Sequence, residues 1–166
     1  MAAAVRPATP SDIPDLARLR WEWRAGEGRP LELDEEAFTA QFGPWLLDHW
    51  GTHMPFVAEA DDAVVGIAWL SVVERVPGPD RMDRRSGLVQ AVYVTPARRD
   101  DGTGGALVQA LIDEAHRRAL DYLAVHPSQR SFSLYRRAGF AEYAGTLELD
   151  IAATRTGPGW SEPAAR

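Results

Sequence analysis

Two hydrophobic periodicities alternate along this chain. Apolar residues recur at helical spacing over residues 13–23 and 104–120, and a further helix is expected at 129–138. Shorter apolar runs predict strands. They lie at residues 5–8, 56–60, 64–73, 87–95 and 122–125. Asp61-Asp62 separates two of these strands and predicts a hairpin turn.

Capping and turn residues set the ends of the predicted helices. Thr9 or Ser11 is the expected cap of the first helix. Another helix is expected to begin at Asp34, with Pro44 kinking or splitting it. Gly139 follows the last helix, at the position where a left-handed glycine commonly ends one.

The order of these elements predicts the fold class, a mixed α/β sheet (α+β). The strand at 87–95, the helix after it and the strand at 122–125 form a crossover unit, so these two strands should run parallel. A final strand pair is expected within 140–151. No repeat or composition shift marks a second domain. We therefore expect a single domain over residues 1–155 and a frayed tail over 156–166.

The composition is ordinary for one globular domain, at 166 residues, 45% hydrophobic and 25% charged. The absence of cysteine excludes disulfides, thiolate metal sites and cysteine nucleophiles. The net charge is -6 and the arginines are interspersed with acidic residues, so we expect no nucleic-acid partner. Lysine and asparagine, whose codons are A-rich, are both absent, which favours a GC-rich bacterial genome.

Two further kinds of partner are not expected. The first residues lack the pattern of a signal peptide, and no apolar run of ~18 residues is present. We therefore expect a cytoplasmic protein with no membrane contact. His49 and His53 are four residues apart, but Gly51 argues against a continuous helix and no acidic third ligand is evident. We therefore expect no metal.

The segment from 92 to 105 carries the strongest functional pattern, a predicted strand that runs into a glycine-rich loop and then a helix. Loop amides converge there, glycines let the backbone approach a ligand, and the helix dipole favours negative charge. This pattern predicts a site for a phosphorylated ligand. The residues of the predicted site are Val92, Tyr93, Val94, Arg99, Asp100, Asp101, Gly102, Thr103, Gly104 and Gly105.

Two motifs resemble the GNAT superfamily of acyl-CoA-dependent N-acetyltransferases. They are Val94-x-Pro96-x-x-Arg99-x-x-Gly102-x-Gly104 and Leu134-Tyr135-x-x-x-Gly139-Phe140, in this order at opposite ends of one βαβ unit. The resemblance implies a GNAT-like fold of six or seven strands, with a parallel splayed pair and about four helices. It also implies acetyl-CoA as co-substrate, with its pantetheine arm bonded to the backbone of Val92 and Val94.

The same resemblance assigns roles around the cofactor. The diphosphate would lie on the amides from Arg99 to Gly105, and Arg99 would grip phosphate or brace the loop. Asp100 and Asp101 stand where the family commonly has glycine or a basic residue, and carboxylates there would repel a diphosphate. Ser128 and Ser131 stand where the family commonly has asparagine and alanine, and they keep a role beside the pantetheine arm.

Acetyl transfer makes three chemical demands: the amine must lose a proton, the developing oxyanion must be stabilised, and the thiolate must be protonated. By resemblance, the Val92 amide is the oxyanion donor and Tyr135 is the general acid. The general base stays open between Glu59, Glu74, His126 and a water relay to a distant carboxylate.

The acceptor implied is the primary amine of a small molecule, with a protein N-terminus or lysine as the second choice. The first two helices cover the acceptor site in this family, and here they carry four tryptophans and several acids. The tryptophans are core residues or an aromatic platform for the acceptor, and the acids form a solvated face or favour a cationic acceptor. These residues are Trp21, Trp23, Trp45, Trp50, Glu22, Glu27, Glu32, Asp34, Glu35 and Glu36.

Other functions remain open. A non-catalytic acyl-CoA sensor would carry the same binding motif. A dinucleotide-binding domain is disfavoured, because no acidic residue ends a following strand about 20 residues on. Many relatives dimerise through their last strands, so a homodimer is one option.

Overall fold

The structure is a computed structural model that describes residues 3–28 and 30–143. Within these residues, five strands form one sheet in the order β1-β2-β3-β4-β5. The strands are β1 (Ala4–Pro7), β2 (His53–Ala60), β3 (Ala63–Glu74), β4 (Arg85–Val94) and β5 (Leu123–Val125). The α-helices are α1 (Ile13–Gly26), α2 (Glu35–Asp48), α3 (Thr103–Arg117) and α4 (Phe132–Arg137). Short 3₁₀ turns lie at Pro10–Asp12, Pro96–Arg98 and Gln129–Ser131.

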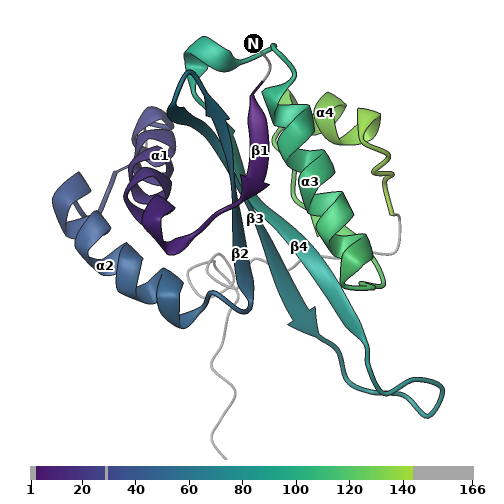
Figure 1. Cartoon of the computed structure of the whole chain (residues 1–166). Coiled ribbons are helices and arrows are strands. Elements are labelled where there is room, and N and C mark those ends of the chain that lie inside the picture. Colours follow the sequence, from purple (N-terminus) through teal and green to yellow (C-terminus); the bar gives the residue numbers. More distant parts are fainter. Residues whose placement is uncertain (1–2, 29, 144–166) are drawn as a thin grey trace, which may run out of the picture.

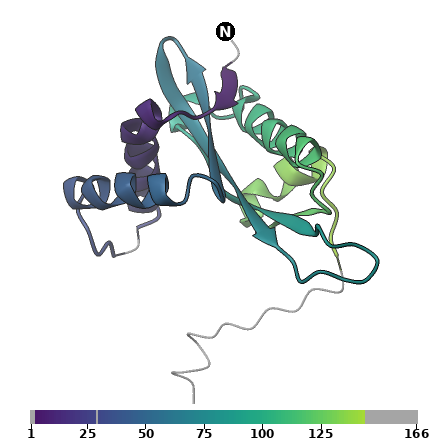
Figure 2. The same cartoon turned by 60° about the horizontal axis from the view of Figure 1, so that its bottom comes forward.

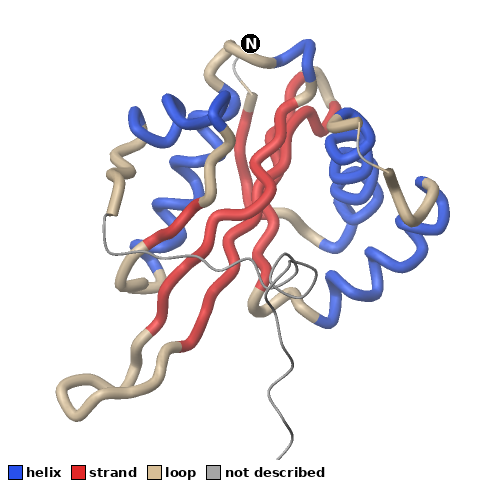
Figure 3. The backbone as a smooth tube through the Cα atoms, turned by 180° about the vertical axis from the view of Figure 1, so that it is seen from behind, coloured by secondary structure: helices blue, strands red, loops and turns tan. Residues whose placement is uncertain are grey.

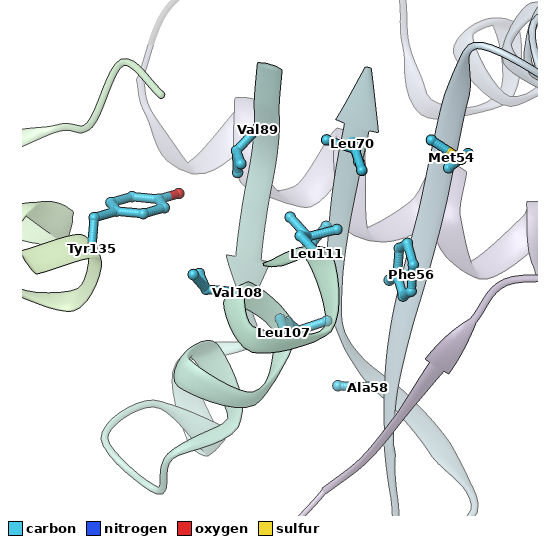
Figure 4. Packing of buried hydrophobic residues seen from close by; sticks show 10 residues of the cluster. Met54, Phe56, Ala58, Leu70, Val89, Leu107, Val108, Leu111 and Tyr135 are labelled. Atoms are coloured by element: carbon cyan, nitrogen blue, oxygen red, sulfur yellow. The ribbon is translucent and has the colours of Figure 1, made fainter. Parts of the chain in front are cut away.

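Helices cover both faces of the sheet, with α1 and α2 on one side and α3 and α4 on the other (Figures 1 and 3). One buried cluster lies beneath α3 and includes Phe56, Leu107 and Leu111 (Figure 4). The other lies beneath α1 and includes Leu19 and Val57. Phe56 and Val57 are neighbours on β2, and successive side chains of a strand point to opposite faces, so one strand supplies both cores.

The topology confirms the predicted mixed sheet and its parallel crossover. β4 and β5 pair in parallel from Gly87–Leu123 to Val89–Val125, while the other neighbouring strands are antiparallel. An added Cβ on Gly87 would lie 2.5 Å from a methyl carbon of Leu123, so glycine allows the two strands to begin their pairing. The β3–β4 hairpin extends beyond the helical layers (Figure 2).

Most of the predicted boundaries hold within a few residues. Thr9 caps the first 3₁₀ turn in a capping box with Asp12, and the Asp34 carboxylate accepts a hydrogen bond from the Ala37 amide at the start of α2. Pro44 does not split α2, because Leu46 on the same helix is buried in the core and holds the helix across the proline.

The last predicted elements lie mostly outside the described residues. Residues 140–143 form a loop, and the remainder of the expected strand pair at 140–151, as well as the tail at 156–166, lies beyond them. The sixth and seventh strands therefore stay predictions. No described helix combines the length and the apolar character needed to cross a membrane.

Candidate active site

A cleft of about 1390 Å³ opens where the pairing of β4 with β5 ends. Val89 and Val125, the last paired residues, lie in its lining. Beyond them β4 continues to Val94, while β5 has ended. The cleft therefore reaches the end of α1 on one side of the sheet and the start of α3 and α4 on the other.

A β-bulge distorts β4 beside the cleft. Ile67 pairs with Tyr93 and Trp69 pairs with Gln90, so one position on β3 faces both Ala91 and Val92. Ala91 has a φ of 52°, in the left-handed region, which costs an L-residue about 1–2 kcal/mol. Bulges redirect the backbone groups of a strand. No glycine in the sequence marks this bulge, so the pattern of residues gave no signal for it.

The loop before α3 has the geometry of an anion site. Asp100 and Gly102 adopt left-handed φ values of 64° and 92°, and these turn the chain into the helix. Gly104 and Gly105 line the cleft as second and third residues of α3. Amides in the first helical turn have no acceptor within their own helix. They are available to an anion at the positive end of the dipole, as the sequence predicts.

Asp101 has a role that the sequence did not reveal. Its carboxylate accepts hydrogen bonds from the Thr103 hydroxyl at 2.6 Å and from the Thr103 amide at 3.0 Å. These bonds lower the pKa of Asp101 below its ordinary value. Asp101 therefore caps α3. Asp100 lies in the cleft lining, whereas Asp101 and Thr103 do not.

Arg99 braces the loop against β4. Its Nε donates a hydrogen bond to the Val94 carbonyl at 3.2 Å, and its guanidinium carbon lies 5.8 Å from the centre of the Tyr93 ring. Of the two roles expected for Arg99, these contacts support the brace.

Tyr135 on α4 is buried beside the cleft, with 6% of its surface exposed. Its hydroxyl points toward Val89 on β4 (Figure 4), and its ring meets Phe140 edge-on at 5.4 Å. Burial raises the pKa of Tyr135 to about 12. No group in the described part of the chain forms a hydrogen bond with this hydroxyl.

The two predicted serines lie in the turn before α4. Ser128 and Ser131 both line the cleft, with their hydroxyl oxygens 3.0 Å apart. The Ser131 hydroxyl also donates to the Ser128 carbonyl at 3.1 Å. Their hydroxyls therefore hold the turn together at the edge of the cleft.

The structure separates the three candidate bases. His126, directly after β5, lines the cleft, and Glu59 and Glu74 do not. Glu59 forms an ion pair with Arg6, whose guanidinium also binds the buried Asp12 at 2.7 Å. This network ties β1 and β2 to the start of α1, which is a structural role.

The end of α1 forms an acidic and aromatic wall of the cleft, which we call the α1 wall. It consists of Trp21, Glu22, Trp23 and Glu27. The opposite side of the cleft carries Arg99, Arg130 and Arg137. The charges of the lining are therefore segregated, with carboxylates at α1 and most of the guanidinium groups near α3 and α4.

The other aromatic and acidic candidates lie elsewhere. Trp45 and Trp50 are not in the cleft lining, and Trp45 stacks on His49 with ring centres 4.3 Å apart. His49 caps the end of α2 and His53 begins β2. In the described ranges, no three His, Asp or Glu side chains group in a way that could hold a metal ion. Glu35 and Glu36 line a separate shallow pocket on α2.

Comparison with known proteins identifies relatives of this fold. The model of the acetyltransferase (GNAT) family matches residues 14–140. A predicted acetyltransferase with acetyl-CoA from Clostridium acetobutylicum has a TM-score of 0.72 at 22% identity, over 90% of this chain and 97% of that one. A GCN5-related N-acetyltransferase from Ralstonia eutropha has a TM-score of 0.69 at 26% identity, over 90% and 99%.

A third relative has a named substrate. Glucosamine-6-phosphate N-acetyltransferase from Arabidopsis thaliana has a TM-score of 0.68 at 14% identity, over 91% of this chain and 99% of that one. No curated protein matches the sequence. At these identities the solved structures establish the fold, and the family model establishes the wider relationship.

Proposed function

Because the chain belongs to the GNAT acetyltransferase family, we propose that it transfers an acetyl group from acetyl-CoA to the primary amine of a small molecule. The observation that carries this proposal is the cleft between the parted strands. It brings the free amides of Gly104 and Gly105 and the buried hydroxyl of Tyr135 to one space. An anion site and a proton donor are the two features that a CoA thioester requires.

The lining of the cleft fits acetyl-CoA. The start of α3 provides amides and a positive dipole for the diphosphate. The edge of β4 at Val92 and Val94 faces the cleft, where amide groups of the pantetheine arm can extend the sheet. An added Cβ on Gly104 would lie 3.6 Å from Leu134 and 3.9 Å from Val94, so glycine leaves a passage between β4 and α4. Bound there, acetyl-CoA supplies an activated acetyl group.

The reaction forms a bond between the amine nitrogen and the acetyl carbon, breaks the carbon–sulfur bond, and moves one proton from the amine to solvent and one to the sulfur. In our proposal the Val92 amide, turned by the bulge, donates a hydrogen bond to the acetyl oxygen. His126 accepts the amine proton, because it is the candidate base that lines the cleft.

Tyr135 supplies a hydrogen bond to the leaving sulfur. With a pKa of about 12 it stays protonated at neutral pH. A thiol has a pKa of about 8.5, so complete transfer of the tyrosine proton to a thiolate is uphill by about 5 kcal/mol. We therefore assign Tyr135 as a hydrogen-bond donor that stabilises the thiolate, with the final proton coming from solvent.

The α1 wall supports a cationic acceptor. Glu22 and Glu27 lie in the cleft, and only one oxygen of each is used by its arginine partner, Arg18 at 3.1 Å and Arg24 at 2.6 Å. A carboxylate has room for further donors. Two carboxylates oppose an anionic acceptor, so the sugar phosphate named for the Arabidopsis relative is disfavoured here.

A panel of amines tested for thiol release from acetyl-CoA, with product mass as a second readout, examines the proposal directly. We expect turnover with at least one small cationic amine. Binding of acetyl-CoA without CoA release for any amine would support the sensor instead. The chain has no lysine, so self-acetylation on lysine cannot contribute to the mass signal.

A further inference from the structure

Four side chains form a continuous contact from the anion-binding loop to α1. The guanidinium of Arg99 lies 5.8 Å from the Tyr93 ring centre. Tyr93 stacks on Trp23 with ring centres 6.0 Å apart and planes 13° apart. The guanidinium carbon of Arg20 lies 4.9 Å from the Trp23 ring centre. We call these four residues the aromatic column.

The column joins two parts of the cleft that are far apart in sequence. At one end, Arg99 belongs to the loop that leads into α3 and is bonded to the Val94 carbonyl. At the other end, Trp23 belongs to the α1 wall. Between them, Tyr93 is 8% exposed and packs in the core beneath α1. Because side chains in such a core are closely packed, Tyr93 cannot shift without moving Trp23.

Arg20 makes the α1 end of the column specific. It forms no ion pair with a carboxylate in the described part of the chain, and burial lowers its pKa. Its described partner is the Trp23 ring. A partly buried guanidinium on an indole is a favourable contact that depends on the orientation of the ring. Trp23 is therefore held by two neighbours, Arg20 and Tyr93.

We propose that the stack of Tyr93 on Trp23 is a positioning contact, through which an anion bound at the loop sets the position of the α1 wall. The inference rests on the proposed function, because it takes CoA as the ligand of the loop. A diphosphate attracts the loop amides and the Arg99 guanidinium. Arg99 lies on Tyr93, so its displacement changes the packing of Tyr93 and, through the stack, the last turn of α1.

Hydrogen–deuterium exchange with CoA as the probe tests this without knowledge of the acceptor. We expect CoA to slow amide exchange in peptides covering residues 20–28 at least threefold in the wild type. Tyr93→Phe keeps the stacked ring and should retain this protection. Tyr93→Leu removes the ring and should lose the protection in α1 while keeping it at 99–106. Trp23→Leu provides the same comparison from the α1 side, should Tyr93→Leu fail to fold.

The pantetheine arm could also touch α1 directly, so a second probe isolates the column. Adenosine 3′,5′-bisphosphate carries phosphates without that arm, and it should still protect residues 20–28 in the wild type. Protection by CoA that is equal in Tyr93→Leu and Tyr93→Phe, or absent in all variants that bind CoA, would overturn the inference. Absence of CoA binding by calorimetry would instead overturn the proposed function. The two failures are therefore distinguishable.

Discussion

The carboxylate of Asp101 accepts hydrogen bonds from both the hydroxyl and the backbone amide of Thr103, two residues further along the chain. A negative charge thus caps the same helix end that would bind a diphosphate. The cap satisfies one of the first-turn amides and leaves those of Gly104 and Gly105 toward the cleft. The fold gains an ordered start of α3, and the site keeps a repulsive charge nearby.

Asp101→Asn should separate these two effects. The amide oxygen of asparagine can keep the bonds to Thr103, while the charge disappears. We expect acetyl-CoA to bind about threefold more tightly at low ionic strength, with the difference shrinking at high salt. Calorimetry at two salt concentrations measures this.

Asp101→Ala is the matched variant, because it also removes the cap and should lower the melting temperature. The lowered pKa of Asp101 adds a pH dependence. The cap is fully present above the unfolded-state pKa of about 3.8 and is lost as the pH falls through the lower folded-state pKa. Equal melting temperatures for wild type and Asp101→Ala at neutral pH would count against the cap.

Tyr135→Phe should lower kcat about 100-fold, because the leaving sulfur loses its hydrogen-bond donor. The ring and its contact with Phe140 remain, so the affinity for acetyl-CoA should change little. Steady-state kinetics with the best amine, together with calorimetry, provide the comparison. A parallel loss of kcat and affinity would show that the hydroxyl serves binding, not the chemical step.

Tyr135 also predicts a loss of stability in alkali. Its pKa is about 10 in the unfolded chain and about 12 in the fold, so the folded state holds the proton more tightly. The stabilisation is complete below pH 10 and disappears as the pH rises through 12. It amounts to roughly 3 kcal/mol. Urea unfolding of the wild type between pH 9 and 12 should show this decline, and Tyr135→Phe should show a smaller one.

Gly104→Ala should block the cofactor without damaging the fold. The new methyl group would make ordinary contacts with Leu134 and Val94, and alanine favours a helix over glycine. The melting temperature should therefore stay equal or rise. The same methyl narrows the passage between β4 and α4, so the Kd of acetyl-CoA should rise at least about tenfold. Unchanged affinity in a folded variant would place the pantetheine arm elsewhere.

The α1 wall predicts a preference for a second positive charge on the acceptor. We expect 1,4-diaminobutane to give a lower KM than butylamine, and Glu22→Gln with Glu27→Gln to remove most of that difference, about threefold to tenfold. The exposed ion pairs of these glutamates contribute little stability, so the fold should persist.

Glu35→Gln with Glu36→Gln is the matched control for this prediction. It makes the same change in net charge on α2, outside the cleft. It should leave the KM values of both amines unaltered. A similar loss of preference in both double variants would indicate a long-range effect of charge rather than a contact in the cleft.

Local patterns predicted much of this protein, for identifiable reasons. Helical spacing and caps such as Asp34 act within one or two turns, so the elements can be read from short windows. The order of those elements then predicts the parallel β4–β5 pair. The glycine loop and Tyr135 lie in motifs whose residues are close in sequence, and both reach the same cleft.

Tertiary packing decided the rest. No local pattern shows that Ala91 is strained in a bulge, that Asp101 caps α3, or that Trp23 and Tyr93 stack across 70 positions of sequence. Nor could composition alone separate Glu22 and Glu27 in the cleft from Glu35 and Glu36 outside it. The physical reason is that hydrophobic periodicity encodes which face of an element is buried. The neighbour that each face meets depends on how distant elements pack together.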